Sequence, residues 1–84
     1  MAEVEVGQVS DYFARVGVAG IDLTSALKVG DTIHVVGHTT DLQQVVGSME
    51  IDRQPVPEAT AGQSVGIKMQ ERVRRGDQVY KVTA

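Results

Sequence analysis

The residues with the clearest potential for chemistry are a serine between two glycines and two histidines. Residues 62–66 read Gly-Gln-Ser-Val-Gly and match G-x-S-x-G, in which a sharp strand-to-helix turn exposes a serine nucleophile. Here Ser64 enters an alternating apolar segment with no helical pattern after it, and both histidines precede it, whereas that hydrolase fold places its histidine last. We therefore interpret Ser64 as a polar turn residue and expect no hydrolase.

The two histidines, His34 and His38, are four residues apart on an apolar alternating segment. Four residues of extended strand span about 13 Å. Two nitrogens on one zinc ion, each at about 2.1 Å from it, must lie within roughly 3.5 Å of each other. Because no third ligand with suitable spacing is present, we expect exposed strand histidines, no metal site and no cofactor.

Paired carboxylates occur at Glu3 and Glu5 and at Glu50 and Asp52. Residues two apart on a strand share a face, and an outward acidic pair is usually solubilising. Since no apolar pocket is indicated around either pair, we expect no general acid there. The sequence thus predicts a protein that is not an enzyme.

The positive charge is concentrated near one end of a chain whose net charge is -3. Residues 68–84 hold five of the eight basic residues but only two of the eleven acidic ones. A basic end of this kind is either a solvated turn region or a surface for an anionic partner such as RNA. Tyr12 and Tyr80 could add stacking surfaces. The candidate binding residues are Lys68, Arg72, Arg74 and Arg75.

Length and composition predict one small domain, residues 1–84, that positions these groups. The chain of 84 residues is 42% hydrophobic and 23% charged, which is near the globular average. It contains no cysteine, and no apolar run is long enough for a membrane span or a secretory signal. We expect a cytoplasmic protein that makes no membrane contact.

Apolar residues alternate with small or polar ones almost everywhere, which is typical of half-buried antiparallel strands. The predicted strands cover residues 4–12, 15–23, 32–37, 42–52, 64–70 and 78–82. The alternation changes phase at Gly7 and at Ala19-Gly20, which indicates bulges or corners that let a sheet curl. The predicted core includes Val18, Ile33, Val45, Met49, Val65 and Ile67.

Turn residues separate these segments, and two of the turns echo each other. Residues 27–33 and 73–79 both carry a Gly-Asp pair, Gly30-Asp31 and Gly76-Asp77, ahead of an apolar strand. Six short strands without a linker favour an all-β fold, a small closed six-stranded antiparallel β-barrel.

Four segments together resemble the barrel domain of elongation factor Tu and related translation GTPases. They are Val29-Gly30-Asp31, residues 49–53, residues 56–66 with the pattern Glu-Ala-x-Ala-Gly-x-x-Val-Gly, and residues 73–77. The resemblance covers roughly residues 7–82. It implies a six-stranded barrel that contacts the ribosome or the acceptor end of a charged tRNA, with Glu50 and Arg53 near the acceptor-end pocket.

The nucleotide-binding half of such a factor is missing, because no G-x-x-x-x-G-K-[ST] pattern occurs and the barrel fills the chain. The sequence therefore predicts a non-catalytic binding module related to translation factors, without a nucleotide cofactor. Its partners would be tRNA, ribosomal RNA or a translation-associated protein. The alternative is a protein-interaction accessory barrel that acts in trans for a larger enzyme and has no nucleic-acid role.

Overall fold

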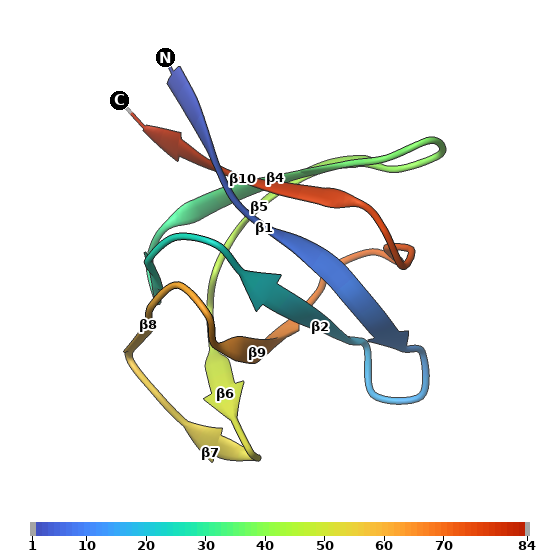
Figure 1. Ribbon diagram of the computed structural model, residues 1–84. Coiled ribbons are helices and arrows are strands. Elements are labelled where there is room, and N and C mark those ends of the chain that lie inside the picture. The colour runs from blue at the N-terminus through green and yellow to red at the C-terminus, as the bar shows by residue number, and fades with distance from the viewer. Residues whose placement is uncertain (1, 84) are drawn as a thin grey trace.

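The fold is all-β, as predicted, in a computed structural model that describes residues 2–83 (Figure 1). No helix in these residues is long and apolar enough to cross a membrane. The strands are β1 (Ala2–Phe13), β2 (Val18–Leu23), β3 (Leu27–Lys28), β4 (Thr32–Val36), β5 (Asp41–Val45), β6 (Met49–Ile51), β7 (Gln54–Pro55), β8 (Glu58–Ala59), β9 (Ser64–Lys68) and β10 (Gln78–Thr83).

Eight of these strands form one antiparallel sheet in the order β5-β4-β10-β1-β2-β9-β6-β7, and β3 pairs with β8 separately. In residues 2–83 the ladder does not return on itself, because β5 and β7 at its two ends are not paired with each other. The predicted closed six-stranded barrel is therefore wrong in strand number and in closure. One cause is residues 46–48, which interrupt the predicted strand 42–52 and separate β5 from β6.

The predicted bulge at Gly7 is confirmed, whereas the one at Ala19-Gly20 is wrong. The register between β1 and β10 shifts between Glu5 and Gly7. β2 continues its alternation without a break, and the second irregularity lies in its partner β1, between Val9 and Asp11. A bulge bends the strand that carries the extra residue, so both irregularities curve the long strand β1.

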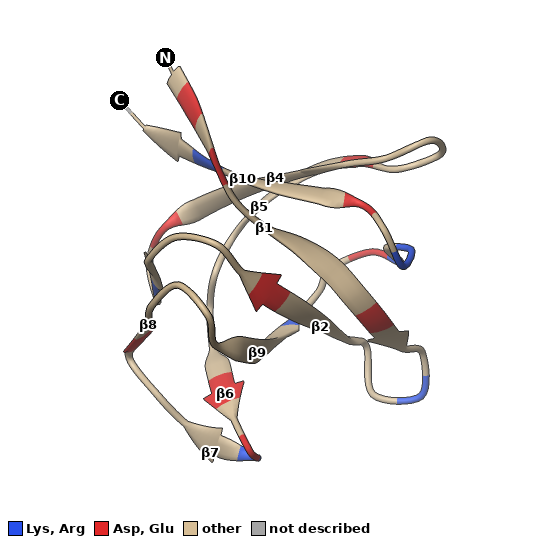
Figure 2. Ribbon diagram, in the orientation of Figure 1, with Lys and Arg blue, Asp and Glu red and all other residues tan. Residues whose placement is uncertain are grey.

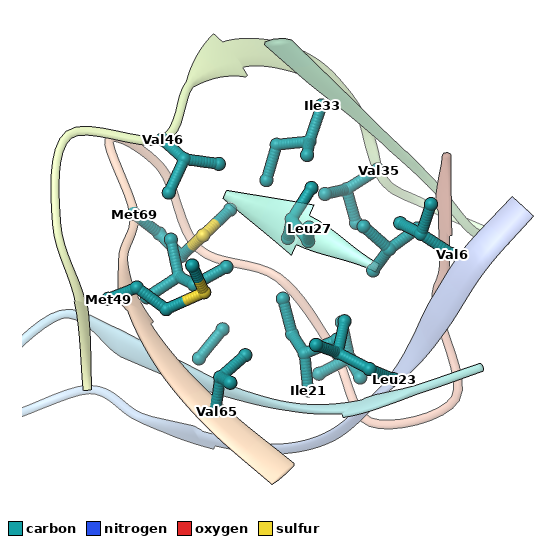
Figure 3. Packing of buried hydrophobic residues seen from close by; sticks show 14 of the residues in the cluster. Val6, Ile21, Leu23, Leu27, Ile33, Val35, Val46, Met49, Val65 and Met69 are labelled. Atoms are coloured by element: carbon teal, nitrogen blue, oxygen red, sulfur yellow. The ribbon is translucent and has the colours of Figure 1, made fainter. Parts of the chain in front are cut away.

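The curled sheet surrounds an apolar core, and Figure 3 shows its side chains pointing into the space between the strands. The predicted core residues Ile33, Met49, Val65 and Ile67 are buried. Val45 is 55% exposed, and Val46 is buried in its place because Leu42 and Gln44 face inward on β5. Val18 is only partly buried, because the inward positions of β2 are Ala19, Ile21 and Leu23.

A buried glutamine side chain joins two strands that share no backbone ladder. Gln44 of β5 donates through Nε2 to the Lys68 carbonyl at 2.9 Å, and its Oε1 accepts from the Gln70 backbone N–H, also at 2.9 Å. The carboxamide thus makes the same donor and acceptor pair that a backbone peptide makes in a ladder. It connects β5, at one end of the sheet, to the end of β9.

The two Gly-Asp turns fold alike, as their sequence echo indicates. In the first turn Asp31 accepts from the Lys28 N–H at 3.0 Å, and in the second Asp77 accepts from the Arg74 N–H at 2.9 Å. Gly30 and Gly76 both have positive φ, at 98° and 94°, which glycine adopts without steric cost. Each turn leads directly into a strand, β4 or β10.

Candidate binding groove

The outer face of the β2–β9 pair carries two glycines side by side. Gly20 and Gly66 are cross-strand partners, and their neighbours Ala19, Ile21 and Ile67 point to the core. Further along the outer face, the Ser64 hydroxyl donates to the Asp22 carboxylate at 2.6 Å. The two glycines therefore leave a strip of the outer face without side chains, and the outer-face positions on either side of it carry side chains.

This strip lies in an open surface groove of about 750 Å³. One bank is apolar, since Phe13 and Val16 are 52% and 53% exposed and Val18 is half-buried beside them. Apolar side chains exposed together in this way are typical of a binding surface. The groove is lined by Phe13, Arg15, Val16, Val18, Gly20, Glu50, Asp52, Arg53, Ser64, Val65 and Gly66.

The opposite bank is charged and is built by the β6–β7 hairpin. Ile51 pairs with Gln54, so Asp52 and Arg53 form a two-residue loop, and both have positive φ, at 52° and 65°. Glu50 projects from β6 beside Gly66, its partner in β9. Figure 2 shows acidic and basic residues together at this tip, and a further basic residue in the β1–β2 turn.

The structure divides the six predicted binding residues into two groups. Glu50 and Arg53 line the groove, whereas the basic residues Lys68, Arg72, Arg74 and Arg75 do not. Arg74 donates to the Thr39 hydroxyl at 3.0 Å, and Arg72 lies 5.8 Å from the centroid of the Tyr12 ring. Arg72 and Arg74 therefore lie outside the groove that Glu50 and Arg53 line.

The remaining two basic side chains are also held by neighbouring groups. Arg75 donates to the Ser10 carbonyl at 3.0 Å and lies 3.8 Å from the Asp11 carboxylate. Lys68 donates to the Val16 carbonyl at 2.9 Å. Tyr12, which was considered a stacking surface, instead packs against the core and under Arg72.

His34 lies away from the groove, between two carboxylates. Its Nδ1 is 2.9 Å from Glu3 and its Nε2 is 2.6 Å from Asp41, so the ring joins β4 to β1 and β5. The hydrogen bond with Asp41 raises the pKa of His34 above its ordinary 6.5, and Glu3 adds to this, although burial acts in the opposite direction. The two carboxylates next to the ring nitrogens stabilise the protonated ring relative to the neutral one.

Sequence reasoning missed the apolar bank of the groove and its floor. Phe13 and Val16 were not among the candidate binding residues, and Val18 was placed in the core. Gly20 and Gly66 gave a usable signal, because glycine inside a strand often marks a site where another chain approaches closely. For Gly20 that signal was instead interpreted as a bulge or corner, and Gly66 was considered only within the G-x-S-x-G match and the family resemblance.

Comparison with known proteins gave no matching family model. The chain is similar to an uncharacterized protease of Methanocaldococcus jannaschii, with 43% identity over 79 residues, which is 93% of this chain and 19% of the relative. It is 37% identical over 81 residues to a collagenase of Porphyromonas gingivalis, covering 94% of this chain and 20% of that protein. The chain thus spans about a fifth of the length of these curated relatives.

Two crystal structures share the fold. Both describe the C-terminal domain of a Geobacillus thermoleovorans protein assigned as a U32 peptidase, one of them a selenomethionine variant. The first superimposes with a TM-score of 0.89 over 95% of this chain and 93% of that chain. The second, the variant, has a TM-score of 0.85 over 89% of this chain and 95% of that chain. At 18% identity these matches establish the fold alone.

The predicted kinship with translation factors is wrong. The sequence relatives are a protease and a collagenase, and the matching solved domains come from a protein assigned as a peptidase. The resemblance rested on two Gly-Asp turns and on residues 49–53 and 56–66, and a likeness in such segments does not fix the function, because similar folds host unrelated functions. The expected translation-related module that contacts tRNA or ribosomal RNA is therefore also wrong.

Proposed function

We propose that this chain is an accessory domain of a protein of the U32 peptidase kind, and that it acts by binding. The observation that carries the proposal is the pattern of coverage. The likeness to a protease and a collagenase runs through more than nine-tenths of this chain but through only about a fifth of each relative. A segment that matches over nearly all of this chain, but makes up only a small part of each longer relative, is typical of a separate domain.

This proposal keeps part of the alternative expected from the sequence, a protein-interaction accessory of a larger enzyme. It changes one feature of that alternative. The matching stretches of the relatives are parts of longer chains, so an action within one polypeptide is the simpler reading, and action in trans is not required. The groove between Phe13 and the β6–β7 hairpin is the surface that such a module would use.

The groups nearest to catalytic chemistry favour binding over cleavage. The Ser64 hydroxyl donates to a carboxylate, Asp22, and no histidine of the described residues accepts from it. Both ring nitrogens of His34 are engaged by carboxylates on other strands. A serine nucleophile is ordinarily activated by a histidine or amine base, and here the hydroxyl's hydrogen-bond acceptor is a carboxylate, a weaker base. We therefore assign no peptide cleavage to this chain.

The accessory role can be tested by exchange. The matching 79 residues of the Methanocaldococcus jannaschii relative would be deleted, or replaced by this chain. We expect the deletion to lower the melting temperature or change the oligomeric state of the relative, and the replacement to restore the parent values. A replacement that behaves like the deletion would contradict a shared module.

The absence of cleavage can be tested on the isolated chain of 84 residues. Incubated with fluorescent casein and with gelatin, it should release no fragments, and the Ser64→Ala variant should be indistinguishable from it. Cleavage that disappears in Ser64→Ala would overturn the binding assignment.

A further inference from the structure

We propose that the groove binds an extended peptide segment in which an apolar residue is followed by lysine or arginine. The apolar side chain would lie against Phe13, Val16 and Val18, and the basic side chain would reach Glu50 and Asp52. The inference rests on the proposed accessory function and adds the chemistry of the partner. Three features of the groove support it.

The first feature is a floor that a peptide backbone can approach closely. Gly20 and Gly66 face each other across β2 and β9 on the outer side of the sheet. A Cβ at Gly66 would lie 3.2 Å from Cγ1 of Val18, and a Cβ at Gly20 would lie 3.2 Å from the Ser10 hydroxyl. A Cβ at either position would press on its neighbour within the domain, so the strip is bare because both residues are glycine. Glycine inside a strand also permits the close approach of another backbone.

The second feature is charge of both signs that has no internal partner. In the part of the chain that the structure describes, Arg15, Glu50, Asp52 and Arg53 form no ion pair within 4.0 Å. Their formal charges cancel, which gives no preference for a polyanion such as RNA. On the β6–β7 bank the two carboxylates outnumber the single arginine, so a cationic side chain is favoured there.

The third feature is a backbone conformation that these residues adopt at a cost. Asp52 and Arg53 are the only non-glycine residues with positive φ in the described chain, and the other such positions are Gly17, Gly30, Gly62 and Gly76. Two-residue hairpin loops of this kind favour Asn-Gly or Asp-Gly. Because glycine would fit this position better, the loop carries a charged arginine at the groove at a cost in backbone conformation.

Two labelled peptides of about nine residues can test this proposal by titration into the full chain. Both consist of glycine and serine around a central pair, Leu-Lys in one and Leu-Glu in the other. At about 150 mM salt we expect the Leu-Lys peptide to shift the amide signals of Phe13, Gly20 and Gly66. It should bind at least about fivefold more tightly than the Leu-Glu peptide, because Glu50 and Asp52 attract the lysine and repel the glutamate.

Variants locate the binding and separate it from folding. Val16→Ala should lower the affinity for the Leu-Lys peptide about threefold, and Phe13→Ala should lower it about tenfold, because apolar contact area is lost. The matched control is Val45→Ala, since Val45 is as exposed as Val16, at 55% against 53%, but lies outside the groove. It should bind as the parent does. Dispersed amide spectra would verify that each variant is folded.

Arg53→Gly provides a second variant whose fold is not at risk. We expect it to raise the melting temperature, since glycine relieves the positive φ, and to strengthen binding of the Leu-Lys peptide at least about twofold, since it removes a positive charge beside Glu50 and Asp52. The inference is overturned if neither peptide shifts the groove amides at about 5 mM, or if Val45→Ala matters as much as Val16→Ala. It is equally overturned if a single-stranded RNA binds at these amides and the peptides do not. If the chain replaces the matching domain of the relative but the peptide titration fails, the accessory role would stand and only the peptide-binding proposal would be rejected.

Discussion

The two faces of the β2–β9 pair belong to the same two strands but differ in how their residues are used. The inner face includes Ala19, Ile21, Val65 and Ile67, which are all buried in the core. The outer face replaces side-chain packing with the Gly20-Gly66 strip and is bordered by an apolar bank and unpaired charges. One face holds apolar area away from water, and the other leaves apolar area and charge accessible.

This difference indicates how a domain of 84 residues can combine stability with binding. Small domains have little stability to spare, so a binding surface cannot draw many residues from the core. A strand solves this problem because alternate side chains point to opposite faces. Stability and binding should therefore respond separately to substitutions made at neighbouring positions, and four predictions test this separation.

The largest effect is expected on the inner face. Ile67→Ala should lower the free energy of unfolding by about 2–5 kcal/mol, because Ile67 is fully buried and its truncation leaves a cavity. Urea denaturation followed by circular dichroism measures the change. A loss smaller than about 1 kcal/mol would mean that this face does not carry the stability.

The next effect has the opposite sign and lies on the charged bank. Arg53→Gly should raise the free energy of unfolding by about 0.5–1 kcal/mol, because glycine adopts the φ of 65° without steric cost. The same denaturation experiment measures it, with Gly76→Ala, at a φ of 94°, as the converse control that should destabilise. A destabilised Arg53→Gly would show that the loop is held by the arginine side chain instead.

A third prediction uses pH to distinguish paired from unpaired charges. Because Asp41 and Glu3 raise the pKa of His34, its stabilising contribution is complete below about pH 6.5 and is lost as pH rises through the higher value of the folded state. Exposed pairs contribute only about 0.2–1 kcal/mol, so the effect is modest. Melting temperatures between pH 5 and 9 should lose this component in His34→Gln and retain it in Glu50→Gln. Identical profiles for all three proteins would contradict it.

The smallest change in stability is expected at the floor of the groove. Gly66→Ala should leave the free energy of unfolding within about 0.5 kcal/mol, because alanine gains strand propensity while its Cβ presses on the partly exposed Val18. Peptide binding should nevertheless fall, since the methyl group occupies the strip. A stable variant that still binds the peptide as the parent does would show that the Gly20-Gly66 strip is not part of the binding site.

The sequence was sufficient for features that follow from alternation and local turn chemistry. Ile33, Met49 and Ile67 lie where a period of two places them, and Gly30 and Gly76 turn the chain as Gly-Asp pairs do. The sequence was insufficient where the partner strand decides which residues face inward and where the register shifts. The irregularity assigned to Ala19-Gly20 lies in β1, and Val45 was predicted to be buried because residues 46–48 were not recognised as a break.

The groove was only partly predictable, because it is assembled from segments far apart in the chain. Glu50 and Arg53 were selected through a resemblance to the wrong family, although both line the groove. Phe13 and Val16 belong to the other bank, and local patterns do not show that the β1–β2 turn reaches the same hollow as the β6–β7 hairpin. Only the sheet order brings these banks together.

The Gln44 carboxamide has a consequence for where the domain opens locally. Between β5 and the end of β9, connection by hydrogen bonds depends on one side chain, whereas the strands of the sheet are joined by backbone ladders. Regions joined by few bonds open locally at a lower free energy than the whole domain. The Gln70 amide should then exchange its hydrogen with solvent faster than the amide of Ile67, only three residues earlier. We expect β5 and the end of β9 to separate before the rest of the domain opens, and to come together again without global unfolding.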